Sequence, residues 1–214
     1  MTVTEALNKR TSIRAYLPTA VAKGTLLEIL AAAERTPSWA NSQPWEVFVA
    51  TGATLERIRG GYAENYAGAV KASVDVERPT QWTESCQNRT KQLYPDMVRD
   101  CGDDVGKFGE LNNSMFNAPA VIYLCVDRLL AHWALWDIGA YSQSVMLAAQ
   151  ERGLSTIPAI TLVSYPDIVR RELKIPDNLR IALGVAVGYA DTSNGINNFH
   201  SARDDLSSVV RFFE

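Results

Sequence analysis

Two arginines near the N-terminus bracket a hydroxyl in the run Arg10-Thr11-Ser12-Ile13-Arg14. Guanidinium groups bind phosphate oxygens through paired N–H donors, and a serine hydroxyl adds another donor. The spacing therefore predicts a site for one phosphate group. The alternative is a solvated basic turn after a short helix.

Two further segments could contact a ligand, one through its hydrogen-bond donors and the other through its backbone. The first, Thr36–Trp45 (TPSWANSQPW), holds the donors Ser38, Asn41, Ser42 and Gln43 between two prolines and two tryptophans. Such a loop suits the edge of a flat heteroaromatic ligand, although an ordinary helix-to-strand loop has the same composition. The second, Gly153–Ala159 (GLSTIPA), lets a ligand approach the backbone, and its plain alternative is a glycine C-cap before a strand.

Several common catalytic patterns are absent. No GxGxxG, GxxxxGK[ST] or GxSxG motif occurs. The two histidines, His132 and His200, are expected to be a cap or surface residues, and the three cysteines lack metal-ligand spacing. We therefore predict no metal site and no catalytic side chain, and expect a cofactor to carry any chemistry.

Composition indicates one globular domain spanning residues 1–214. Apolar residues make up 47% of the chain, charged residues 21%, and the net charge is −3. The chain has no clustered basic face for nucleic acid and no apolar run long enough for a membrane span or a signal peptide. A cytoplasmic protein is expected.

Periodicity predicts interleaved helices and strands, the mark of an α/β or α+β protein. The expected helices are 4–9, 23–35, 53–72, 106–117, 136–152 and 165–173, and the expected strands are 45–51, 120–126, 155–161 and 181–189. Helix 136–152 is apolar nearly all round, which is typical of a central or interface helix. The apolar terminus, residues 208–213, must pack on something, such as a neighbouring subunit. Residues 73–105 lack a steady period and are either a lid or a surface excursion.

Taken in order, these segments resemble the nitroreductase family of FMN-dependent oxidoreductases. The resemblance rests on KRTSIRAY, TPSWANSQPW, the run from Asp137 through Gln143 and LAA to GLSTIP, GVAVGYAD, and Arg203 before SVVRFF. These segments span nearly the whole chain, with residues 53–117 outside them.

The resemblance implies an α+β fold, with helices around a central, mostly antiparallel sheet. It also implies an intertwined homodimer with FMN at the interface and a C-terminal tail, beyond Asp191, that wraps the partner. The implied FMN ligands are Arg10, Thr11, Ser12, Arg14 and Arg203 near the phosphate and ribityl chain, Pro37, Ser38, Trp39 and Asn41 from the partner, and Pro158, Ala159 and Ile160 near flavin N5. Because proline has no N–H, Ala159 or Ile160 is the expected donor to N5.

The implied activity is ping-pong hydride transfer, in which NAD(P)H reduces FMN and a small nitroaromatic, such as a nitrobenzoate, or a quinone reoxidises it. Three alternatives stay open: a reductive dehalogenase using the nearby Thr156 hydroxyl, a flavin-cleaving enzyme of the same family, and a non-catalytic flavin-binding protein. Reduction of bound FMN by NADH separates the enzymes from the carrier.

The excursion and the helix before it supply candidate acceptor-binding residues, namely Tyr62, Tyr66, Trp82, Arg89 and Tyr94. The aromatic rings can cover a flat acceptor, and Arg89 can pair with a carboxylate. The sequence therefore predicts a preference for carboxylated nitroaromatics. The alternative is that Arg78, Arg89 and Lys91 are solvated and balance nearby acids.

Overall fold

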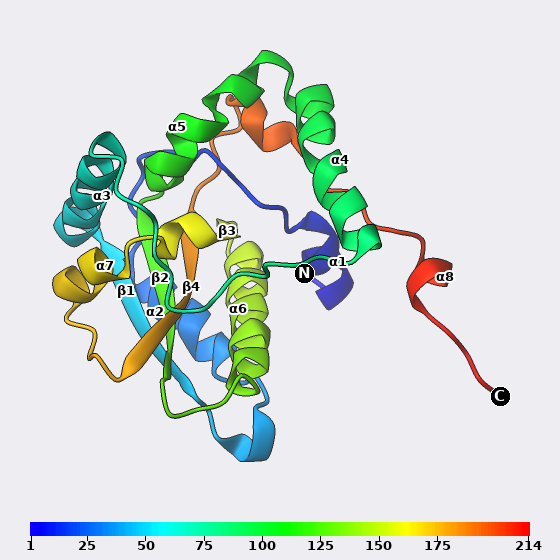
Figure 1. Ribbon diagram of the computed structural model, residues 1–214, viewed down its shortest axis with the longest axis horizontal. Helices are drawn as coiled ribbons and strands as arrows, with labels where there is room; N and C mark the ends of the chain where they lie inside the picture. Colours follow the sequence, from blue (N-terminus) through cyan, green and yellow to red (C-terminus); the bar gives the residue numbers. More distant parts are fainter.

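A four-stranded antiparallel sheet forms the centre of the computed structural model, which describes residues 1–214 (Figure 1). The strands are β1 (Trp45–Thr51), β2 (Ala120–Asp127), β3 (Ser155–Ala159) and β4 (Leu179–Gly188), in the order β1-β2-β4-β3. Every neighbouring pair is antiparallel. The α+β prediction is therefore confirmed.

Helices cover both faces of this sheet (Figure 1). They are α1 (Val3–Lys9), α2 (Lys23–Ala33), α3 (Gly52–Ala67), α4 (Glu84–Cys101), α5 (Phe108–Asn113), α6 (Ala134–Glu151), α7 (Pro166–Leu173) and α8 (Leu206–Val209). Short 3-10 helices are η1 (Trp39–Asn41), η2 (Gly102–Lys107), η3 (Met115–Asn117), η4 (Ile160–Val163) and η5 (Gly195–Asn198). None of the helices is long and apolar enough to cross a lipid bilayer.

The sheet separates two apolar clusters, because successive side chains of a strand point to opposite faces. Val121, Tyr123 and Cys125 of β2 pack with residues of α3 and α7, whereas Ile122 and Leu124 pack with residues of α2 and α6. Strand β2 is buried along almost its whole length, which agrees with its continuous apolar sequence.

Helix α6 lies centrally on its face of the sheet, as its sequence predicts. Ile138, Tyr141 and Val145 are buried against the sheet. Its N-terminal end differs, because Trp133 and Trp136 are 61% and 74% exposed. Apolar surface therefore remains uncovered at this end of the helix.

The prediction that residues 73–105 are irregular is wrong for most of that range. Residues 84–101 form helix α4, and the Thr83 side chain caps it by accepting from the Cys86 N–H. Only Met97 and Cys101 of this helix are buried, and Pro95 lies inside it. Leu93, Met97 and Cys101 recur every four positions, which is a helical spacing, but Pro95 and the many polar residues between them hid this period in the sequence.

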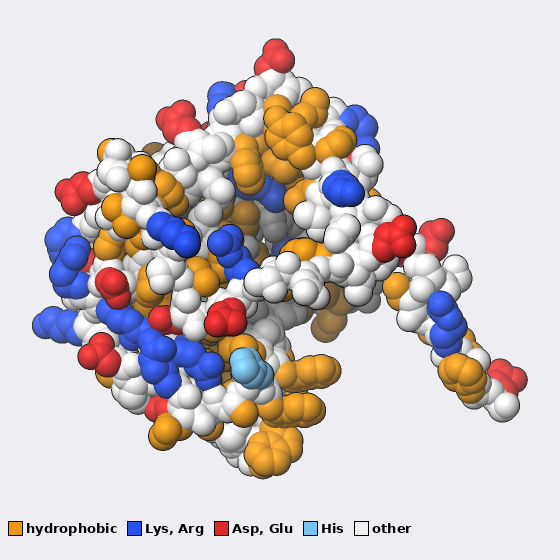
Figure 2. Space-filling view, viewed as in Figure 1, with side chains coloured by type: hydrophobic (Ala, Val, Ile, Leu, Met, Phe, Trp, Pro, Cys, Tyr) orange, Lys and Arg blue, Asp and Glu red, His pale blue; other side chains and the backbone are white.

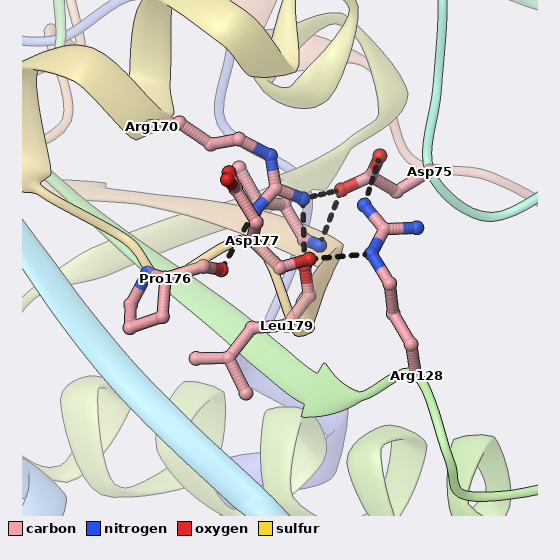
Figure 3. A network of polar contacts seen from close by, with 7 residues as sticks. Asp75, Arg128, Arg170, Pro176, Asp177 and Leu179 are labelled. Atoms are coloured by element: carbon pink, nitrogen blue, oxygen red, sulfur yellow. Dashed lines mark hydrogen bonds and ion pairs between the residues drawn. The ribbon is translucent and has the colours of Figure 1, made fainter.

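The irregular stretch is shorter, residues 68–83, and Asp75 fastens it to the sheet (Figure 3). The Asp75 carboxylate accepts from Arg170, from Arg128 at 3.2 Å and from the Ile181 N–H at 2.8 Å. The side chains of Asp75 and Arg170 are each only 12% exposed. This buried network holds the connection between α3 and α4 against β4 and α7.

The C-terminal tail leaves the body of the molecule after η5 (Figure 1). Its apolar side chains are largely uncovered: Val209 is 62% exposed, Phe212 88% and Phe213 92%. Packing of this tail on a neighbouring subunit stays a prediction.

Candidate functional site

The arginines of the N-terminal motif and Arg203 line one cavity of about 530 Å³. It lies among α1, the segment that follows it, α4 and the stretch after η5. Its charged lining residues are Lys9, Arg10, Arg14 and Arg203, beside His200, and no aspartate or glutamate lines it. The structure therefore brings Arg10, Thr11, Ser12, Arg14 and Arg203 together in an electropositive cavity.

Arg10 owes its place to the end of α1. A capping box starts this helix at Thr2, and the Arg10 N–H ends it by donating to the Ala6 carbonyl at 2.9 Å. Burial, and then repulsion from the Arg203 charge, lowers the pKa of Arg10. None of Arg10, Arg14 and Arg203 forms an ion pair. Cations that repel one another without an acidic partner suit an anionic ligand.

Arg14 is held by Asn197, a residue that sequence reasoning missed. The Asn197 Oδ1 accepts from the N–H groups of Arg14 at 2.7 Å and of Ala15 at 3.2 Å, and its amide donates to the Ala15 carbonyl at 2.8 Å. The Arg14 guanidinium lies 5.2 Å from the centre of the Phe199 ring. No local sequence signal identifies Asn197, because the contact joins the two ends of the chain.

The Arg14 side chain also keeps one buried donor without a partner. Its Nη1 donates to the Ser12 carbonyl at 2.9 Å, but its Nε makes no hydrogen bond. Burial lowers the pKa of Arg14. Buried polar groups in proteins almost always have partners, so this N–H is an exception. Because it is closed off from solvent, as the Thr156 hydroxyl is, Arg14 would meet an anion through its charge and its other N–H groups.

Strand β3 approaches the cavity through Ser12. Ser12 forms a parallel bridge with Thr156, and the Ile13 N–H donates to the Thr156 carbonyl at 3.1 Å. Two positions beyond Thr156, β3 reaches Pro158 and Ala159, and then η4 starts at the exposed Ile160. The Thr156 side chain is enclosed, since the residue is only 2% exposed. Its hydroxyl is therefore not open to a bound molecule, contrary to what the dehalogenase alternative needs.

The loop of Pro37, Ser38, Trp39 and Asn41 does not join these residues within one chain. Trp39 instead lines a separate cavity with the N-terminal end of α6. The loop backbone is unusual, because Ala40, Asn41 and Gln43 all have positive φ, at 51°, 54° and 45°. The Ser38 Oγ supports it by accepting from the Gln43 N–H at 2.9 Å.

The prediction that Tyr62 contacts an acceptor is wrong. Tyr62 has no exposed surface, its hydroxyl donates to the Leu162 carbonyl at 2.8 Å, and it accepts from the Tyr165 N–H at 3.3 Å. The aromatic character that suggested a substrate wall serves the core instead. Tyr66 is half-buried and packs edge-to-face on Tyr165, with ring centres 5.5 Å apart.

The remaining candidates lie on or beside α4. Trp82 and Tyr94 are 50% and 61% exposed, and their contact with an acceptor stays a prediction. Arg89 Nε donates to the Asp204 carboxylate at 2.7 Å. This pair favours the alternative that the basic residues of the excursion balance nearby acids.

Comparison with known proteins relates the chain as a whole to nitroreductases. The model of the nitroreductase family matches residues 7–189. A 4-nitrobenzoate reductase from Pseudomonas putida is 28% identical over 208 residues, which cover 95% of this chain and 92% of that protein. A chloronitrobenzene nitroreductase from Comamonas testosteroni is 28% identical over 219 residues, covering 98% and 96%. The crystal structure of the FMN and NADPH-dependent nitroreductase NfnB from Sphigopyxis sp. strain HMH superposes on all of both chains with a TM-score of 0.91 and 26% identity.

Proposed function

This chain belongs to the nitroreductase family, and we propose that it is an FMN-dependent oxidoreductase that uses NAD(P)H to reduce small nitroaromatic compounds. The observation that carries the proposal is the acid-free cavity that gathers Arg10, Arg14 and Arg203, none of which forms an ion pair. The solved relative described as FMN and NADPH-dependent, and the nitrobenzoate and chloronitrobenzene reductases, support the cofactor, the donor and the acceptor class.

The residues present fit the phosphate end of FMN. A phosphate monoester carries about two negative charges at neutral pH and several strong acceptor oxygens. Arg10, Arg14 and Arg203 would supply the charge-assisted donors, and Thr11 and Ser12 would supply hydroxyl or backbone donors. These side chains bind and orient, and no acid or base is needed among them.

The far end of the cofactor would lie toward β3. Pro158 cannot donate, so the proposed donor to flavin N5 is the N–H of Ala159 or Ile160. Bound FMN would supply the hydride chemistry between the nicotinamide and the acceptor. The contribution of the chain is to hold the ring and to leave one face open for each reactant in turn.

A homodimer would complete the site, and we propose one. The loop of Ser38, Trp39 and Asn41 lines a different cavity from the arginines, so in this proposal it meets FMN bound by a second copy. The exposed apolar tail would pack on that copy. We further propose that residues 1–214 act as one FMN-binding domain, with residues 73–105 beside the acceptor.

The two half-reactions test this function separately. The FMN-loaded protein is mixed anaerobically with NADPH or NADH, and loss of the absorbance of oxidised flavin is followed. The reduced protein is then mixed with nitrobenzene, 4-nitrobenzoate, a quinone or a halotyrosine, and return of the absorbance is measured. We expect bleaching by a nicotinamide and reoxidation by the nitroaromatics.

Each alternative activity predicts another result. A flavin-binding carrier would not be bleached by either nicotinamide. A dehalogenase would be reoxidised by halotyrosine and release halide, but would turn over nitroaromatics poorly. A flavin-cleaving enzyme would consume its own FMN irreversibly when exposed to oxygen.

A further inference from the structure

Exposed tryptophans gather where the loop before β1 meets the N-terminal end of α6. Trp39, Trp133 and Trp136 are 68%, 61% and 74% exposed, and the rings of Trp133 and Trp136 stack with centres 6.2 Å apart and planes 7° from parallel. Figure 2 shows hydrophobic side chains protruding in this region, beside a histidine. A cluster of large exposed aromatic side chains is typical of a binding surface.

A cavity of about 410 Å³ opens within this cluster. Trp39, Pro44, Leu130 and Trp133 are among the eight residues that line it. This volume lies in the usual range for small-molecule sites, which are mainly apolar and aromatic. A flat, largely apolar molecule suits such a wall.

One charged side chain lines the cavity, the carboxylate of Asp137 in the first turn of α6. Asp137 is only 3% exposed, and its Oδ1 accepts one hydrogen bond, from the Trp39 N–H at 3.3 Å. No lysine, arginine or histidine pairs with it. An anion brought into this cavity would lose water and meet a like charge, both of which are unfavourable.

The cavity adjoins the loop that the proposed function places at the flavin edge. Trp39 belongs to both, and the bond from its N–H to Asp137 ties the loop to α6. A molecule held between Trp39 and Trp133 would therefore lie beside the cofactor contributed by the second copy.

We infer that this cavity binds the aromatic ring of the acceptor, with Trp133 as a stacking wall, and that Asp137 selects uncharged nitroaromatics over carboxylated ones. The inference rests on the proposed function and names the substrate class of its site. It reverses the sequence-based expectation of a preference for nitrobenzoates. A nitrobenzoate would bind more weakly, with its carboxylate kept out of the cavity.

Binding of non-reducible ligands tests the cavity without relying on turnover. Equilibrium dialysis of the FMN-loaded protein measures Kd for 4-bromobenzamide and 4-bromobenzoate, which differ in charge. We expect the amide to bind at least about tenfold more tightly than the acid, equivalent to about 1.4 kcal/mol. Asp137→Asn keeps an acceptor for Trp39 and should narrow this ratio to about threefold or less.

Trp133 is tested with two substitutions and one neighbouring control. Trp133→Leu should raise Kd for 4-bromobenzamide at least about tenfold, whereas Trp133→Phe should restore most of the affinity because it keeps a ring. Leu129→Ala removes a side chain that is 93% exposed and does not line the cavity, so Kd should stay within about twofold. Melting temperatures show whether each variant is folded.

Two results would overturn the inference. Unchanged amide binding in Trp133→Leu would show that the ring lies elsewhere, and an unchanged amide-to-acid ratio in Asp137→Asn would remove the charge selection. Failure of the proposed function is a separate observation: the parent protein would bind 4-bromobenzamide as expected, but its reduced FMN would not be reoxidised by nitrobenzene.

Discussion

Asp75→Ala should destabilise this protein more than any change to a surface ion pair. The carboxylate is the shared acceptor for Arg170, Arg128 and the Ile181 N–H, and it joins an otherwise irregular connection to β4 and α7 (Figure 3). The substitution deletes one anion and leaves every donor in place.

The expected loss in the free energy of unfolding is the sum of the losses at the donors that Asp75 accepts from. Arg170 is 12% exposed, and removing one partner of a buried ion pair costs about 3–5 kcal/mol. Arg170 keeps its bonds to the carbonyls of Leu179 at 2.7 Å and Pro176 at 3.0 Å, which favours the lower end of that range. Arg128 is 44% exposed, so its pair adds about 0–1 kcal/mol. We expect a net loss of about 3 kcal/mol, with the Ile181 N–H accounting for part of it.

Urea unfolding measures this loss as a lower midpoint at unchanged slope. Protomer concentration and FMN saturation must be equal for all variants, because binding and association shift apparent stability. Glu56→Ala is the control: Glu56 is 66% exposed and pairs with Arg59, so its removal should cost less than about 1 kcal/mol. The reasoning is refuted if Asp75→Ala costs no more than this control.

The remaining predictions concern the cofactor, the thiols and the assembly. Arg10→Ala and Arg14→Ala should each weaken FMN binding by about 1.5–3 kcal/mol, measured by ultrafiltration and flavin fluorescence, and unchanged affinity would exclude them as phosphate ligands. Burial raises the pKa of Cys101 and raises that of Cys125 to about 12, so at pH 8 iodoacetamide should modify Cys86 first, and early modification of Cys125 found by mass spectrometry would contradict this. Analytical ultracentrifugation should show a dimer at micromolar concentration, and a folded, FMN-loaded monomer would refute the proposed assembly.

Local patterns in the sequence predicted most of the secondary structure. The apolar run of β2 and the spacing of the apolar residues of α6 each depend on neighbours within a few positions. The cluster from Arg10 to Arg14 was equally visible, since two guanidinium groups and a hydroxyl lie within five residues. Each of these features can be predicted from residues that are close together in the sequence.

Other features depended on contacts between distant parts of the chain. Helix α4 does carry apolar residues at helical spacing, but most of its residues are polar and Pro95 lies inside it, so the sequence was interpreted as irregular. Tyr62 belongs to the core because its hydroxyl meets residues of η4 and the turn after it, about one hundred positions away. Asn197 reaches Arg14 across 183 positions.

The aromatic cavity shows most clearly the difference between what the sequence predicts and what the tertiary structure decides. Trp39 and Asp137 were both part of the sequence resemblance, but their shared cavity with Trp133 was not predicted. It exists only because the loop before β1 contacts the start of α6, although Trp39 and Asp137 are 98 positions apart in the chain. Residue type and spacing define which side chains can do chemistry, whereas long-range packing of the sheet and its helices decides which of them share a site.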